Sequence, residues 1–255
     1  MTQDHTIHNN HSNFCDPSSH TQKICALIKE TLMTSGASGY VLGISGGIDS
    51  AIVATLLVQA VGAKNVVGLF LPSSTTPKQD YDDVAVLGSW LEIPIHTFSL
   101  QPVLAGYQEI MSGSRLGWGN LTSRIRMNLL YLYANEHHLL VSGTSNKTEW
   151  YIGYFTKYGD SAADIQPIIH LFKDEVYAFA THLQVPSCFI EKTPSAGLYE
   201  GQTDEADLQM SYTSLNAALR SLEKQNWVAQ NEDEERVMRL YQASLHKRLP
   251  PPQIL

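Results

Sequence analysis

The chain has 255 residues, which is enough for one large domain or two small ones. Charged residues make up 16% and apolar residues 43% of the sequence, a balance typical of a globular protein with a large core. The net charge of −8 argues against a nonspecific nucleic-acid binder, because such proteins are usually basic. The three cysteines form no C-x-x-C pair, so we expect neither a disulfide framework nor a zinc ribbon, and a cytoplasmic location fits.

Two segments of unusual composition bear on the organisation of the chain. Residues 1–19 are polar and contain no secretory signal, so we expect a mobile tail before a single domain over residues 20–255. The most apolar stretch, residues 41–63, is interrupted by a Ser-Gly-Gly turn and by Asp49. Because a bare carboxylate is costly inside a bilayer, this stretch predicts a buried strand and helix rather than contact with a membrane.

Strands and helices alternate along the first 150 residues. Short apolar runs predict strands at residues 40–44, 65–71, 94–98 and 139–141, and helical periodicity predicts helices at residues 25–33, 50–61, 80–91 and 121–133. This order implies an α/β fold with a doubly wound, mostly parallel sheet and helices on both faces. After residue 150 we expect loops and two or three helices of the same domain.

Parallel sheets of this kind bind ligands beyond the carboxyl ends of their strands. Three segments follow predicted strands and carry the small and polar residues that suit a site. We therefore expect residues 43–50, 71–77 and 142–144 to converge.

The string Ser-Gly-Gly-Ile-Asp-Ser at residues 45–50 joins the first predicted strand to the next helix. Its glycines permit a tight turn, and the helix N-terminus presents N–H groups and partial positive charge, so the segment suits a phosphate. It lacks the lysine of the ordinary P-loop and the G-x-G-x-x-G spacing of a dinucleotide site. Asp49 beside phosphates would require a bridging cation, and Mg²⁺ fits that role. The alternative is a plain turn in which Asp49 only caps the helix.

This string resembles the pyrophosphate-binding loop of the ATP pyrophosphatases, the PP-loop superfamily, whose members cleave ATP to AMP and pyrophosphate. The resemblance implies an adenine nucleotide alpha hydrolase-like fold. It also implies that a carbonyl oxygen is activated as its adenylate before a nitrogen or sulfur nucleophile displaces AMP. Sulfur-transfer members often carry paired cysteines, and this sequence has no such pair.

A polar face marks the helix predicted at residues 121–133. Asn120, Arg124, Asn128 and Tyr131 are spaced by four, four and three residues, so they share that face, while Arg126 points elsewhere. One arginine could face an anionic substrate while the other makes a structural or interface ion pair. A solvated polar face is the alternative.

A series of short blocks later in the chain distinguishes among members of the superfamily. The blocks are residues 143–149, 153–160, 163–167, 194–198, 202–205 and 211–212, together with Lys173. Their order and spacing resemble the NAD synthetase family from about residue 20 to residue 248. Members of that family make NAD from deamido-NAD, ATP and ammonia. The nicotinate carboxylate attacks the α-phosphate of ATP, pyrophosphate leaves with Mg²⁺, and ammonia attacks the acyl adenylate.

The resemblance also implies roles for individual residues. ATP would be bound by Gly43, Ile44, Ser45, Gly46, Gly47, Ile48, Asp49, Ser50, Thr144, Lys173 and Ser195. Asp49 and Glu149 would ligate Mg²⁺, and deamido-NAD would be contacted by Arg124, Lys157, Asp164, His246 and Lys247. Asp160 and Lys173 would be catalytic, with Asp160 binding or deprotonating ammonium. Because the protein is acidic, its lysines and arginines and Mg²⁺ must form a local positive site for these anions.

Several of these residues have simpler interpretations. Asp160 could cap a turn after Gly159, Glu149 could be an exposed helical carboxylate, and His246 and Lys247 could belong to a frayed end. The sequence also departs from the family at one place, where Gln209 and Met210 lead into the last block and a glycine is usual. The geometry of a lid is therefore in question there.

The resemblance bears on the nitrogen donor and on assembly. Glutamine-using relatives carry an amidase domain upstream, whereas the pattern here starts near residue 20, so we expect free ammonia as the donor. The family implies a homodimer, and the apolar stripe of residues 121–133 suits either an interface or the core. Two alternative functions are another PP-loop ATP pyrophosphatase and a nucleotide-binding regulatory protein that has lost catalysis.

Overall fold

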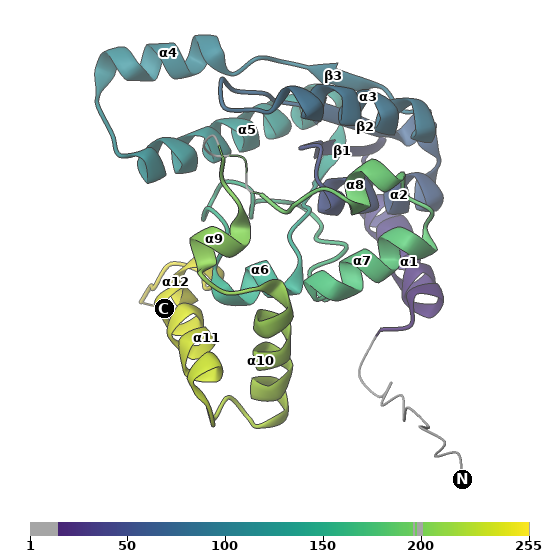
Figure 1. The fold of residues 1–255 in the computed structure, drawn as a ribbon. Helices are drawn as coiled ribbons and strands as arrows, with labels where there is room; N and C mark the ends of the chain where they lie inside the picture. The colour runs from purple at the N-terminus through teal and green to yellow at the C-terminus, as the bar shows by residue number, and fades with distance from the viewer. Residues whose placement is uncertain (1–14, 196, 198–200, 255) are drawn as a thin grey trace.

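The protein is built on a four-stranded parallel sheet of order β3-β2-β1-β4 (Figure 1). We describe it from a computed structural model, which covers residues 15–195, 197 and 201–254. The strands are β1 (Gly39–Gly43), β2 (Val66–Phe70), β3 (Ile95–Thr97) and β4 (Leu139–Ser142). Each lies where a short apolar run predicted it, so the expected α/β fold with a parallel sheet is confirmed.

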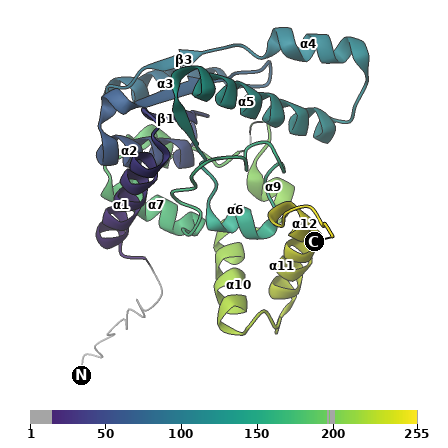
Figure 2. The same cartoon turned by 180° about the vertical axis from the view of Figure 1, so that it is seen from behind.

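Helices cover both faces of this sheet (Figures 1 and 2). Successive strand residues point to opposite faces, so Tyr40 and Leu42 pack with one set of helices and Val41 with another. The first set includes α1 (Pro17–Ser35), α2 (Ile48–Val61) and α7 (Lys173–His182), and the second set comprises α4 (Gln101–Ile110) and α5 (Arg115–His137). The remaining helices are α3 (Lys78–Leu91), α6 (Lys147–Ile152), α8 (Ser187–Ile190), α9 (Asp204–Leu208), α10 (Tyr212–Lys224), α11 (Glu232–Ala243) and α12 (Leu245–Arg248), with the 3-10 helix η1 at Ala63–Asn65.

The first helix starts slightly before the domain start that we expected. Asp16 caps α1 by accepting a hydrogen bond from the Ser19 N–H at 2.8 Å, and Pro17 occupies the first helical position. The helix therefore begins at Pro17, and residues 17–19 of the expected tail are helical. Residues 1–14 of that tail lie outside the described residues.

The C-terminal part is more helical than we expected. From α7 onward the described residues form six helices, and three of these have only four or five residues, too few to show helical periodicity in the sequence. A second apolar cluster, which includes Ile152, Leu215, Leu219 and Val237, joins the α10–α11 pair to α6. Nowhere in the part of the chain that the structure describes is a helix long and apolar enough to cross a membrane.

The departure from the family pattern at Gln209 leaves the backbone bend in place. Gln209 follows α9 in the left-handed conformation, with φ of 50°, which is the conformation that a glycine favours at a helix end. The chain therefore turns as a glycine would allow, with a side chain in a sterically unfavourable region.

Gln209→Gly should raise the free energy of unfolding by about 0.5 kcal/mol, because relief of the left-handed strain exceeds the extra entropy of the unfolded glycine. Urea denaturation measures the change. Ala217→Gly, at an exposed position inside α10, is the control and should lower stability by about 1 kcal/mol. Destabilisation by both substitutions would show that Gln209 is not strained.

Candidate functional site

A cavity of about 620 Å³ opens at the carboxyl ends of the strands. Its lining includes residues from each of the three segments that we expected to converge after β1, β2 and β4. Gly43 and Asp49 come from the first, Leu71 and Pro77 from the second, and Thr144 from the third. The expected convergence is confirmed.

The Ser-Gly-Gly turn leads from β1 into the N-terminus of α2. Ser45 Oγ accepts a hydrogen bond from the Gly47 N–H at 3.2 Å, and Ser50 Oγ donates to the Gly47 carbonyl at 2.9 Å. Gly46 has φ of 78°, and no side chain caps the helix. The carboxylate of Asp49 instead accepts hydrogen bonds from Asn146 and Lys173, so the interpretation of Asp49 as a helix cap is wrong.

Lys173 is the buried centre of the site. Only 2% of it is exposed, and its ammonium lies 2.6 Å from Asp49 Oδ2 and 3.0 Å from Glu149 Oε1. The hydroxyl of Tyr212 donates to Asp204 Oδ2 at 2.9 Å and lies 3.4 Å from Glu149 Oε1. Two carboxylates thus contact the ammonium, and the Tyr212 hydroxyl places a third, that of Asp204, next to this pair.

Burial and neighbouring carboxylates both shift the acid–base equilibria of the cluster. Burial, reinforced by Asp49 and Asp204, raises the pKa of Glu149 to about 7 even though Lys173 opposes the shift. Burial also raises the pKa of Asp204. A further cation beside these carboxylates would lower both values.

The donor set fits Mg²⁺ when a substrate supplies part of the coordination. Carboxylate oxygens are the ligands that this ion takes from proteins, and Asp204 Oδ1 is buried without a hydrogen-bond partner. Within the described residues, no three His, Cys, Asp or Glu side chains are arranged to hold a metal by themselves. Mg²⁺ typically keeps one or two carboxylates and completes its shell with phosphates and water, so Asp49 and Glu149 suffice.

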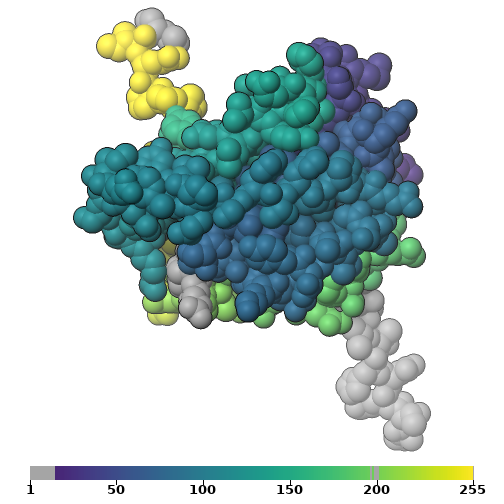
Figure 3. Space-filling model, turned by 90° about the horizontal axis from the view of Figure 1, so that it is seen from above, coloured from purple at the N-terminus to yellow at the C-terminus, as the bar shows by residue number. Residues whose placement is uncertain are grey.

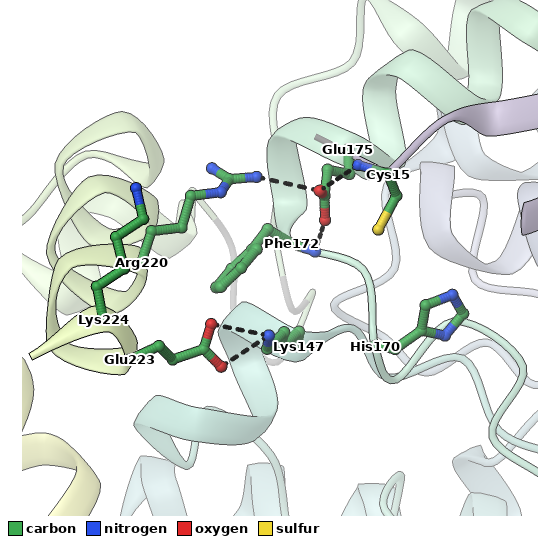
Figure 4. Close-up of a pocket in the computed structure, with 8 residues that line it drawn as sticks. All are labelled: Cys15, Lys147, His170, Phe172, Glu175, Arg220, Glu223 and Lys224. Atoms are coloured by element: carbon green, nitrogen blue, oxygen red, sulfur yellow. Dashed lines mark hydrogen bonds and ion pairs between the residues drawn. The ribbon is translucent and has the colours of Figure 1, made fainter. Parts of the chain in front are cut away.

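A second, smaller cavity adjoins the start of α7. It has a volume of about 270 Å³ and is lined by Cys15, Lys147, His170, Phe172, Glu175, Arg220, Glu223 and Lys224 (Figure 4). Glu175 Oε2 accepts from the Phe172 N–H at 2.8 Å, and Oε1 accepts from the Cys15 N–H at 3.0 Å. Lys147 pairs with Glu223 at 2.7 Å. These contacts fix the start of α7, where Lys173 is the first residue.

Asp160 lies at the cavity and also holds a turn. Its Oδ1 accepts from Ser123 Oγ at 2.6 Å and from the Thr156 N–H at 2.9 Å. Thr144 and Ser195 line the same cavity. The location of all three agrees with the roles that we expect, but their roles stay predictions.

The residues expected to contact deamido-NAD are divided between the cavity and the outer surface. Of these five, only Lys247 lines the cavity, and its ammonium is held by the carbonyls of Gly153 and Phe155 at 2.7 and 2.8 Å. Arg124 Nε donates to the Lys157 carbonyl at 3.3 Å, and Lys157 Nζ donates to the His246 carbonyl. These three therefore lie together outside the cavity of a single chain.

Asp164, the fifth of these residues, is engaged with the sheet. Its Oδ2 accepts from the Val141 N–H of β4 at 2.7 Å, and its Oδ1 accepts from the Tyr131 hydroxyl at 3.3 Å. Burial raises the pKa of Tyr131 to about 12, and the Asp164 charge adds to the shift. Both C-terminal candidates, His246 and Lys247, lie in α12, so the segment is not a frayed end.

Four charged residues of the cavity were not predicted from the sequence: Asp80, Arg126, Lys192 and Asp204. The spacing showed that Arg124 and Arg126 point in different directions but could not show which side of the helix the cavity adjoins. Arg126 lines it and donates to the Leu71 carbonyl at 3.0 Å. Asp204 belonged to a block that we quoted, but no spacing linked it to Glu149.

Comparisons with known proteins agree with one another. Residues 20–251 match the family model described as NAD synthase. A Methanoregula boonei protein named NH(3)-dependent NAD(+) synthetase is 43% identical over 231 residues, covering 90% of this chain and 93% of that protein. An Archaeoglobus fulgidus protein of the same name is 41% identical over 236 residues, covering 91% and 94%.

Solved structures give the same picture of the fold. An NMN synthetase from Francisella tularensis matches with a TM-score of 0.87 and 35% identity, and an NH3-dependent NAD synthetase from Campylobacter jejuni with 0.82 and 32%. Each match covers 94% of this chain and 99% of the other. A glutamine-dependent NAD+ synthetase from Acinetobacter baumannii shares the fold at 22% identity, and the match covers 47% of its length.

Asp80 and Lys192 pack so closely against Gly46 that the effect of a larger residue there can be predicted. A Cβ at this position would lie 3.2 Å from both Lys192 Nζ and Asp80 Cβ, so Gly46→Ala should displace the turn and weaken ATP binding by about tenfold, equivalent to about 1.4 kcal/mol. Titration calorimetry measures the affinity. Gly36→Ala is the matched control, because Gly36 has a similar φ of 70° but no atom within 4 Å of its Cβ position. Equal ATP affinity in the two variants would contradict the prediction.

Proposed function

Because the chain belongs to the NAD synthase family, we propose that its cavity is the site where free ammonia amidates deamido-NAD at the expense of ATP. The observation that carries the proposal is the Lys173 ammonium between Asp49 and Glu149, beside a phosphate-binding turn at the strand ends. The nicotinate carboxylate attacks the α-phosphate of ATP and releases pyrophosphate. Ammonia then attacks the carbonyl of the acyl adenylate, which yields NAD and AMP.

The triphosphate of ATP belongs at the turn between β1 and α2. Residues 43–50 supply N–H groups and the positive end of the α2 dipole, and Thr144 and Ser195 face the same space. Lys173 adds a buried positive charge whose position is fixed by its two carboxylate partners. A charge held in place before the reaction stabilises the developing negative charge without reorganisation.

Mg²⁺ is the cofactor that this site would use. Asp49 and Glu149 would hold it. Burial, reinforced by the charges of Asp49 and Asp204, raises the pKa of Glu149, and a divalent cation there would stabilise the charged carboxylate. When bound, Mg²⁺ neutralises phosphate charge and stabilises pyrophosphate as it leaves.

Asp160 is the residue that we assign to ammonium. Ammonium must lose a proton before its nitrogen can attack a carbonyl, and a carboxylate at the cavity wall can both bind the cation and accept the proton. The bonds from Ser123 and Thr156 fix the orientation of this carboxylate. These bonds also stabilise the turn, and Asp160 can accept them while it binds ammonium.

A second copy of the chain would explain where deamido-NAD binds. Arg124, Lys157 and His246 lie outside the cavity, so a nucleotide that reaches them extends over the surface. Elsewhere on the surface, α4 and the first turn of α5 expose four large apolar side chains, Val103, Tyr107, Ile110 and Leu116. In Figure 3 the α4 segment lies at the surface, at one end of the molecule. Leu116 belongs to both this surface and the cavity lining. We infer that this surface forms a homodimer interface.

Two alternatives fit the site less well. Another ATP pyrophosphatase would not require Lys247 at the cavity wall together with Arg124 and Lys157 on the surface outside it. A regulatory protein without catalysis would not retain Lys173 between two carboxylates with Asp160 at the same cavity wall.

The proposed reaction predicts that ATP, Mg²⁺, deamido-NAD and ammonium chloride together yield NAD, AMP and pyrophosphate in equal amounts. Chromatography measures the three products. Removing Mg²⁺ with EDTA, or replacing ammonium by glutamine, should abolish NAD formation. Nicotinic acid mononucleotide should be offered in parallel, since one structural relative is an NMN synthetase. Preference for the mononucleotide, or equal use of glutamine, would contradict the proposal.

If the apolar surface of α4 forms the dimer interface, negative charges introduced there should dissociate the dimer. Ile110 and Met111 are 77% and 65% exposed, so the variant Ile110→Asp/Met111→Asp should raise the dimer dissociation constant by at least about tenfold. Sedimentation velocity measures the species. Met33→Asp changes a side chain of α1 that is 83% exposed and should leave the dimer intact. A fully active wild-type monomer would refute the interface.

A further inference from the structure

Lys192 approaches the phosphate-binding turn from a distant part of the sequence. It follows α8, and its ammonium donates to the Gly46 carbonyl at 2.8 Å, 146 residues away along the chain. It also donates to Asp80 Oδ1 and Asp83 Oδ2, both at 2.7 Å. The side chain lines the cavity and is 26% exposed, so a ligand at the turn can reach its ammonium.

The turn itself lacks the lysine that a P-loop uses to hold the terminal phosphates of a nucleotide. Three other cations line the cavity, and each is held elsewhere: Lys173 by Asp49 and Glu149, Lys247 and Arg126 by backbone carbonyls. Among these four cations of the described cavity wall, Lys192 is the one that bonds to the backbone of the Ser-Gly-Gly turn.

We propose that Lys192 is the pyrophosphate-binding lysine of this site and contacts the β- and γ-phosphates of ATP and the pyrophosphate product. This inference rests on the proposed function, because it assigns a residue to the leaving group of that reaction. The ammonium has three N–H donors, and its three acceptors are two carboxylates and the neutral Gly46 carbonyl. A phosphate oxygen is a stronger acceptor than a carbonyl, so it replaces the Gly46 carbonyl while both ion pairs stay.

The surroundings of Lys192 support this exchange. Gly46 has no Cβ, and one placed there would stand 3.2 Å from the ammonium, so the glycine leaves the phosphate side of the lysine open. Asp80 and Asp83 are mostly buried, with side chains 11% and 3% exposed, and they belong to α3 rather than to a mobile loop. They fix the lysine beside the turn and more than neutralise its charge. This surplus of negative charge favours the release of pyrophosphate after the reaction.

The first test is Lys192→Met in the full-length protein, with Lys64→Met on the exposed surface as the matched control. Calorimetric titration with Mg-pyrophosphate, and inhibition of NAD formation by pyrophosphate and by AMP, are the measurements. We expect pyrophosphate binding and the KM for ATP to worsen by about tenfold and AMP inhibition to stay within about twofold. Lys192→Arg should recover most of the affinity. A merely structural ion pair would lower the melting temperature without this selective loss, and that outcome would overturn the proposal.

A second variant keeps the test decisive if Lys192→Met does not fold. Asp83→Asn removes one competing charge from Lys192 at a residue that does not line the cavity, so pyrophosphate should bind about threefold more tightly. Unchanged or weaker binding would overturn the proposal. If the wild type binds pyrophosphate through Lys192 but makes no NAD, the proposed function fails separately. If it makes NAD and neither variant changes pyrophosphate binding, only the assignment of Lys192 fails.

Discussion

The ion pairs of the buried Lys173 ammonium connect three parts of the fold that are distant in sequence. Asp49 stands in the first turn of α2, Glu149 in α6 and Lys173 at the start of α7. A buried charge without partners would cost several kcal/mol, so the protein must keep both carboxylates within reach to keep the lysine charged. The phosphate-binding turn at the start of α2 and the helices of the C-terminal half therefore depend on one another.

Hydrogen bonds from several elements fix the start of α7 and so keep Lys173 close to its two carboxylates. Thr148 Oγ1 accepts from the Lys173 N–H at 3.0 Å and donates to Asn216 Oδ1 at 2.6 Å, so α6, α7 and α10 meet at one hydroxyl. Glu175 closes the first turn of α7 from the opposite side. All of these side chains are buried, and a shift of α7 would leave polar groups without partners. The long-range geometry of the site is thus maintained by local hydrogen bonds at one helix end.

The parts of the site that could be predicted are those whose chemistry is contiguous in sequence. The strand, turn and helix over residues 39–61 are specified by apolar runs and by glycines, and the carboxyl ends of parallel strands must meet at one edge. Lys192, Arg126 and Asp204 were missed because each reaches the cavity through tertiary packing. No local pattern states which face of α5 meets the sheet, or that a lysine after α8 will return to the turn after β1.

The protein has a net charge of −8, yet its proposed substrates are polyanions. The contacts that hold the lysines and the arginine of the cavity explain how both can be true. Lys173 and Lys192 each bind two carboxylates, which offset their charges, while neutral backbone carbonyls orient Lys247 and Arg126. The same partners fix the donors in place before the substrate arrives, which is the condition for electrostatic stabilisation without reorganisation. Phosphate recognition here depends on the position of paired cations rather than on an overall positive potential. An acidic protein can therefore bind ATP at one edge of its sheet and still release pyrophosphate.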